Sequence, residues 1–98
     1  MQYKISWLNE AVEELGEIRR YIETEEQEPE AAVAVVSRIY EAADSLSSMP
    51  ERFPKDPERP KFRRYAVISS YSIFYQIKGT RVYIAHIWNN ARNLKNLE

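Results

Sequence analysis

The sequence contains no cysteine, two glycines and one histidine among its 98 residues. Without cysteine there can be no disulfide framework, thiolate metal site or cysteine nucleophile. Two glycines leave no glycine-rich phosphate loop, and a single histidine excludes sites that need two imidazoles. The longest apolar run, residues 31–36, is far too short to cross a membrane. We therefore expect no cofactor, no metal site and no membrane contact, and we expect a cytoplasmic protein.

Charge is distributed unevenly along the chain, although the formal net charge is only −1. Residues 1–50 contain 11 acidic and 4 basic side chains, whereas residues 51–98 contain 4 acidic and 10 basic ones. The two halves therefore carry −7 and +6, and such asymmetry indicates an interaction surface. The length and an apolar content of 44% predict one folded domain, residues 1–98.

The first half of the chain reads as a short strand followed by two helices. Residues 3–7 alternate between apolar and polar positions, which is typical of a strand. Asn9 or Ser6 can cap the first helix, and Pro29 and Pro50 suit the start and the end of the second. Two apolar stripes at helical spacing support these helices: Leu8, Ala11, Val12, Leu15, Ile18 and Ile22, then Ala32, Val33, Val36, Ile39, Tyr40, Ala43 and Leu46.

The second half is rich in aromatic and β-branched residues, which favour strands. We expect strands over residues 62–68, 71–77 and 81–88, with a tight hairpin turn at residues 78–80. The order β-α-α-β-β-β predicts an α+β domain in which a helix hairpin packs on one face of a mainly antiparallel four-stranded sheet. The other face of the sheet is then available for binding.

A basic stretch precedes the second strand, and with its three acids it carries a charge of +3. It can contact phosphates, with neighbouring aromatic rings stacking on bases. It can equally be a solvated loop beside a strand edge, or the contact for an acidic protein partner. The basic residues are Arg52, Lys55, Arg59, Lys61, Arg63 and Arg64.

A second candidate segment is the end of the last strand with the polar residues that follow it, from His86 to Asn93. Arg92 can pair with a phosphate or a carboxylate through two parallel hydrogen bonds. A histidine side chain can take part in proton transfer, but no partner for His86 is visible in the sequence, so we interpret it as an ordinary strand residue. Four acids of the first helix are interpreted as a solvated face: Glu10, Glu13, Glu14 and Glu17.

Several short motifs, in this order and spacing, resemble the ParE/RelE family of toxins from bacterial type II toxin–antitoxin modules. The resemblance covers nearly the whole chain. The motifs that carry it are Ala11-x-x-x-Leu15-x-x-Ile18-x-x-Tyr21-Ile22, Met49-Pro50, Arg64-Tyr65 followed by Tyr71-Ser72-Ile73-Phe74-Tyr75-Gln76-Ile77, and Val82-Tyr83-Ile84 through Ile87 to Arg92.

The resemblance implies a small toxin that binds a cognate antitoxin, usually encoded beside it. RelE-like members cleave mRNA on the ribosome, whereas ParE-like members act on DNA gyrase and are not nucleases. Ser72 stands where RelE-like nucleases carry an arginine, Asn89 where many carry a histidine, and Asn90 where a basic residue is common. Asparagine cannot serve as a general acid or base, so these departures favour the ParE-like function.

We therefore expect a toxin that inhibits an essential target of the DNA gyrase type and is neutralised by direct binding of its antitoxin. The residues expected to contact target or antitoxin are Arg63, Arg64, Asn89, Asn90 and Arg92. One alternative is a ribosome-dependent mRNA endoribonuclease, and another is a non-toxic interaction module of the same fold. The catalytic candidates for a nuclease are Arg92, Arg64, Tyr71 and His86.

Overall fold

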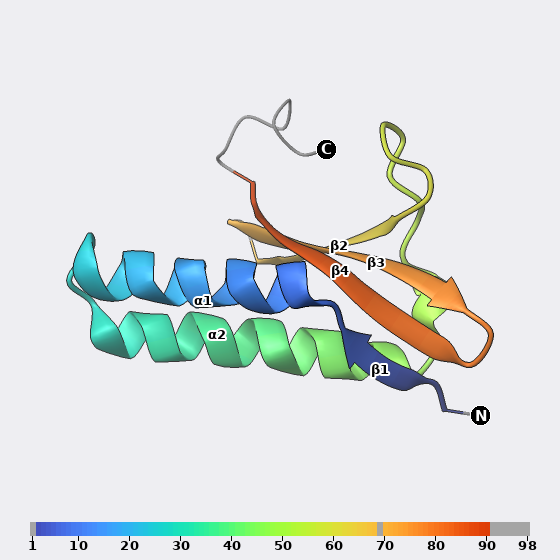
Figure 1. Cartoon of the computed structure of the whole chain (residues 1–98), viewed down its shortest axis with the longest axis horizontal. Helices are drawn as coiled ribbons and strands as arrows, with labels where there is room; N and C mark the ends of the chain where they lie inside the picture. The colour runs from blue at the N-terminus through green and yellow to red at the C-terminus, as the bar shows by residue number, and fades with distance from the viewer. Residues whose placement is uncertain (1, 69, 91–98) are drawn as a thin grey trace.

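The computed structural model describes residues 2–68 and 70–90. A hairpin of two helices forms one layer and a twisted four-stranded sheet forms the other (Figure 1). Two short 3₁₀ turns, Ser45–Ser47 and Pro50–Arg52, lead from the helices to the sheet. The elements in chain order are β1 (Lys4–Trp7), α1 (Asn9–Thr24), α2 (Pro29–Asp44), β2 (Arg63–Ile68), β3 (Tyr71–Lys78) and β4 (Arg81–Asn89).

The strands lie in the order β1-β4-β3-β2. β1 runs parallel to β4, and the other two neighbouring pairs are antiparallel. The chain returns from β1 to the sheet only after the helix hairpin, which covers one face of the sheet as βα crossovers do. The predicted α+β fold, with its helix hairpin on a mainly antiparallel sheet, is confirmed.

The helix ends differ in two places from the sequence prediction. Neither Asn9 nor Ser6 caps α1, because Leu8 occupies the N-cap position and no side chain caps the helix. The backbone N–H of Leu8 instead donates to the carbonyl of Ile84, so the chain is still paired with β4 one residue before α1 begins. Pro29 does begin α2, but the α-helix ends at Asp44 rather than near Pro50.

The main core lies between the helices and the inner face of the sheet. Small residues such as Ala11 and Ala32 are completely buried and allow α1 and α2 to approach closely. Four residues counted in the apolar stripes are exposed rather than buried in this core: Leu8, Val12, Val33 and Tyr40 are 37%, 53%, 61% and 60% exposed. The stripes predicted the helices correctly, but they included positions that the structure exposes to solvent. None of the helices in the described part of the chain is long and apolar enough to span a membrane.

A β-bulge in β4 changes which side chains of this strand face the helices. Phe74 pairs with His86 while Tyr75 pairs with Ile84, so Ala85 is one residue extra on β4. Beyond the bulge the side chains change faces, and Ile87 joins Ile84 in the main core. Tyr71, Ile73 and Tyr75 belong to this core as well, whereas Phe74, Trp88 and Phe62 form a second cluster. The face that carries this second cluster is called the outer face below.

Candidate functional site

The outer face carries a row of side chains that crosses three strands. Arg64 of β2 pairs with Phe74 of β3, and Phe74 pairs in turn with His86 of β4. The Arg64 guanidinium lies over the Phe74 ring, 5.4 Å from its centroid. Phe62, at the end of the preceding loop, packs against the Phe74 ring and forms a T-shaped contact with the His86 ring. The row thus joins a cation, an aromatic floor and an imidazole on one surface.

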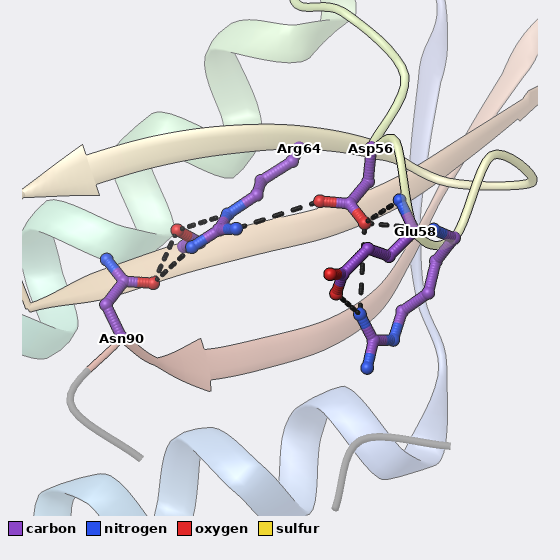
Figure 2. A network of polar contacts seen from close by, with 6 residues as sticks. Asp56, Glu58, Arg64 and Asn90 are labelled. Atoms are coloured by element: carbon purple, nitrogen blue, oxygen red, sulfur yellow. Dashed lines mark hydrogen bonds and ion pairs between the residues drawn. The ribbon is translucent and has the colours of Figure 1, made fainter. Parts of the chain in front are cut away.

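Arg64 is the centre of a polar network on this face (Figure 2). Its Nε donates to the Ser72 hydroxyl at 3.1 Å, and its Nη2 donates to Asn90 Oδ1 at 2.8 Å. The Ser72 hydroxyl donates to the same amide oxygen, also at 2.8 Å. The three side chains come from β2, β3 and the residue directly after β4, so the network closes across the full width of this part of the sheet.

Asp56 completes the network from the loop between the 3₁₀ turns and β2. Its carboxylate is 3.7 Å from Arg64 Nη1, and its other oxygen accepts hydrogen bonds from the backbone N–H groups of Glu58 and Arg59 (Figure 2). Asp56 is only 5% exposed. Two N–H donors and a guanidinium compensate the loss of hydration around this buried carboxylate. Asp56 therefore fastens the loop to the outer face.

The network limits what Arg64 can do chemically. Its side chain is 30% exposed, which leaves room for contact with an anion or a carbonyl. All three nitrogens of its guanidinium group, however, already face partners. Ser72 is fully buried, and an asparagine amide does not titrate near neutral pH. The site can bind and orient a polar group, and it holds its arginine in one place while doing so.

Two other arginines of the basic stretch have structural roles. Arg63 points away from Arg64 because neighbouring strand residues face opposite sides of a sheet. Its Nη1 donates to the carbonyls of Glu51 and Phe53 at 3.2 and 2.7 Å. Arg52 donates to the carbonyl of Ser48 at 2.6 Å, among other oxygens of that turn. The structure therefore separates Arg63 from Arg64, which the sequence had grouped as joint contacts.

Two tyrosines of β3, Tyr71 and Tyr75, lie in the main core rather than on the outer face. Tyr71 is 7% exposed and belongs to the main core, so the structure does not bring it to the Arg64 network as a catalytic acid. Tyr75 is fully buried and its hydroxyl donates to the Pro50 carbonyl at 2.6 Å. Burial raises the pKa of Tyr75 to about 12, although Arg63 and Arg52 act in the opposite direction. Tyr75 remains a neutral hydrogen-bond donor near neutral pH.

His86 does have a partner, contrary to the sequence interpretation. Its Nδ1 lies 3.2 Å from Glu14 Oε2, and the other oxygen of Glu14 accepts the backbone N–H of Ile87 at 2.9 Å. β1 pairs with β4 only as far as Ile84. The Glu14 carboxylate therefore fills the hydrogen-bonding position of the missing strand. The interpretation of Glu14 as part of a solvated face was wrong, because helical spacing alone does not reveal an open strand edge.

Asn89 and Asn90 divide between two surfaces. Asn90 joins the Arg64 network, whereas Asn89 lines a small hollow of about 90 Å³ together with Glu14, Glu17 and Trp88. Arg92 lies outside the described residues. Of the predicted contact set, the structure brings together Arg64 and Asn90. No group of three or more histidine, aspartate or glutamate side chains is placed to hold a metal ion within residues 2–68 and 70–90.

The chain matches the sequence model of a known protein family. Residues 5–94 match the sequence model described as the ParE toxin of the type II toxin–antitoxin system parDE. The chain belongs to the ParE toxin family. A search of curated protein sequences finds no significant match to it.

Solved structures agree with the ParE-family fold. A chain of the chromosomal ParDE toxin–antitoxin system from P. aeruginosa is 23% identical, with a TM-score of 0.75 over 90% of this chain and 96% of that one. A chain of the RelBE2 toxin–antitoxin complex from Mycobacterium tuberculosis is 22% identical, with a TM-score of 0.62 over 94% of this chain and 95% of that one. The ParE and RelE branches therefore share the two-layer architecture seen here.

Ser72 is the residue that we expected to stand where RelE-like nucleases carry an arginine. The serine is fully buried beneath the Arg64 guanidinium. Arg64 and Asn90 were predicted from the sequence, whereas Asp56 was counted only as an acid in a basic stretch. An aspartate within a loop is a weak sequence sign of such an anchor, because its carboxylate can accept a hydrogen bond from the backbone N–H two residues later.

Proposed function

We propose that this ParE-family protein is a toxin that acts in the cytoplasm by binding an essential protein of the DNA gyrase type. We further propose that a cognate antitoxin neutralises it by direct binding. Membership of the ParE family supports the toxin role. The similarity to chains from the P. aeruginosa ParDE and M. tuberculosis RelBE2 systems supports an antitoxin partner.

We favour a binding mechanism because the Arg64 side chain is held in place by its neighbours. Cleavage of RNA through its 2′-hydroxyl needs groups that remove and deliver protons and that stabilise developing negative charge. Here the arginine is tied to Ser72, Asn90 and Asp56. A guanidinium fixed on a partly exposed surface is well suited to recognition of a partner carboxylate or carbonyl.

The proposed contact surface is the outer face around Arg64 and Asn90. Asn89 and Arg92 follow or adjoin Asn90 in the chain, and we include them as contacts for target or antitoxin. We keep Arg63 in the set as an indirect contributor, because its hydrogen bonds to Glu51 and Phe53 support the loop that ends beside this surface.

A second candidate function is favoured by the pairing of His86 with Glu14. A carboxylate at 3.2 Å from Nδ1 can orient an imidazole, and general acid–base catalysis uses imidazoles that are oriented in this way. His86 also lies in the same cross-strand row as Arg64. The alternative is therefore a ribosome-dependent endoribonuclease that uses His86 and Arg64. The experiment must distinguish it from the binding mechanism.

Controlled expression in a sensitive bacterium tests the proposal. We expect growth arrest that is relieved when the small protein encoded beside the toxin is produced as well. Primer extension on abundant mRNAs should show no new cuts during the arrest, whereas markers of DNA damage should rise. Arg64→Ala should weaken the arrest, and Arg38→Ala, at an exposed position of α2, should leave it unchanged.

Two outcomes would count against the proposal. Codon-linked mRNA cuts that disappear in His86→Ala would establish the endoribonuclease instead. Soluble expression without arrest would leave only the non-toxic interaction module.

A further inference from the structure

The sheet has an unpaired edge on β3, next to the loop that precedes β2. β2 begins opposite Tyr75, so β3 continues for three residues, 76–78, with a neighbour only on the β4 side. Within residues 2–68 and 70–90, no backbone hydrogen bond links this edge to the loop. Unpaired strand edges are templates for an additional strand.

A hollow of about 370 Å³ lies along this edge and is lined by charges of mainly one sign. Its far wall is formed by the loop residues Pro60 and Lys61, and its near wall by the edge of β3. We call it the β3 slot. The charged residues that line it are Lys55, Lys61, Arg63, Lys78 and a single acid, Glu51.

The three lysines of the slot have no ion-pair partner in the described part of the chain. Lys61 and Lys78 lie over the rings of Phe62 and Tyr83, at 5.1 and 5.9 Å from the ring centroids. Glu51 is the acceptor for the Tyr3 hydroxyl, and it offsets only part of the positive charge. Like charges gathered around one hollow repel each other unless an anionic group enters.

We propose that the β3 slot binds an extended, carboxylate-bearing peptide segment, which pairs with the edge of β3 and places its acidic side chains among the three lysines. Identification of this segment as part of the antitoxin rests on the function proposed above. Backbone pairing supplies affinity and the lysines select acidic side chains. The residues of the Arg64 network, which are Asp56, Arg64, Ser72 and Asn90, are not among those that line the slot.

A nucleic acid strand fits the slot less well. Binding of unpaired nucleotides relies on exposed aromatic faces on which bases stack. The aromatic residue that lines the slot is Tyr75, which is fully buried and bonded to the Pro50 carbonyl. Phe62 belongs to the second cluster with Phe74 and Trp88. The slot thus offers charge and a strand edge, which are the two features that an acidic peptide uses.

The test is a titration of the full ¹⁵N-labelled chain, followed by NMR, with four synthetic probes. The probes are a hexapeptide of alternating glutamate and valine, the same peptide with lysine for glutamate, a version of the acidic peptide with a central proline, and a short oligouridine. We expect the acidic peptide to shift the amide signals of Gln76, Ile77 and Lys78, and the proline version to bind at least several-fold more weakly, because proline cannot donate to a strand edge.

Charge-neutralising variants supply the matched control. The triple variant Lys55→Gln, Lys61→Gln, Lys78→Gln should weaken binding of the acidic peptide about tenfold, as expected for three partly exposed pairs. Lys4→Gln, on the opposite edge strand, should change binding less than about twofold.

Four results would overturn the inference: no shift with the acidic peptide, equal binding of the lysine peptide, equal binding of the proline peptide, or stronger shifts of the same amides with oligouridine. Because none of these measurements depends on growth arrest, failure of the slot can be told apart from failure of the toxin function.

Discussion

Glu14 of α1 and His86 of β4 are 72 residues apart in the chain and lie 3.2 Å from each other, Oε2 to Nδ1. The same carboxylate accepts the N–H of Ile87 at 2.9 Å, where β4 has run past the end of β1. A side chain from a helix thus completes the hydrogen bonding of a strand. This contact fixes how α1 sits against the sheet and gives the only histidine a carboxylate neighbour.

The first prediction concerns this contact. Glu14→Ala should lower the free energy of unfolding by about 1–3 kcal/mol, because it leaves a partly buried backbone donor without its acceptor. Glu13→Ala, on the exposed side of α1, is the matched control, because it also removes a glutamate side chain but leaves no backbone donor without an acceptor. It should change the free energy of unfolding by less than about 0.5 kcal/mol. Urea denaturation of both variants measures the difference. Equal losses would show that the Glu14 contact contributes nothing.

Much of the fold could be predicted from the sequence, because hydrophobic periodicity reports directly on which side of an element is buried. The stripes through Ala11 and Ala32 placed both helices correctly, and the aromatic runs placed the strands. The role of Glu14 could not be predicted, since it depends on β1 being too short to cover β4. The bulge at Ala85 was equally invisible, because it is a property of strand pairing and not of local composition.

The candidate site could be predicted only in part, for a related reason. Arg64 and Asn90 were both expected as contacts, and the structure joins them directly. Arg63 was grouped with Arg64 because the two are adjacent, yet adjacent strand residues face opposite sides. Asp56 was missed because a carboxylate in a basic loop gives no sign that it is buried until the loop is seen to fold back on the sheet.

A second prediction tests the Arg64 network as a unit. A double-mutant cycle of Arg64→Ala and Asn90→Ala should give a coupling energy of about 0.5–3 kcal/mol in thermal or urea unfolding, since the two side chains share a hydrogen bond. A cycle of Arg64→Ala with Arg38→Ala, on α2, should give a coupling near zero. Additive losses in the first cycle would mean that the two groups are independent.

A third prediction concerns alkaline pH. The pKa of Tyr75 is raised to about 12 from its ordinary value of 10.0, chiefly because the hydroxyl is buried. The unfolded chain therefore ionises this tyrosine first as the pH rises. Its contribution to stability is complete below pH 10 and is lost between about pH 10 and 12.

Tyr75→Phe should remove this part of the alkaline decline, so that its free energy of unfolding falls less steeply than that of the wild type between pH 10 and 12. Tyr21→Phe, at a half-exposed position of α1, should keep the wild-type slope. Urea denaturation at a series of pH values makes the comparison. A wild-type slope in Tyr75→Phe would contradict the assignment.

A fourth prediction uses the two glycines as a matched pair. Gly79 has φ +61° in the β3–β4 turn, with nothing within 4 Å of an added Cβ, so Gly79→Ala should cost about 1 kcal/mol of backbone strain alone. Gly16 lies within α1, and an added Cβ meets only Arg20 at an ordinary 3.7 Å. Gly16→Ala should therefore stabilise the protein by up to about 1 kcal/mol. Changes of the same sign, measured by thermal unfolding, would contradict this reading.

We propose that the protein acts on a gyrase-type target by binding. The most direct measurement adds the purified chain, in parallel, to DNA gyrase with relaxed plasmid and to translating ribosomes with a defined mRNA. We expect loss of supercoiling or accumulation of cleaved plasmid, with intact mRNA. Arg64→Ala should weaken the effect on gyrase, and Arg38→Ala should not. Unimpaired gyrase together with mRNA cut on the ribosome would contradict this proposal.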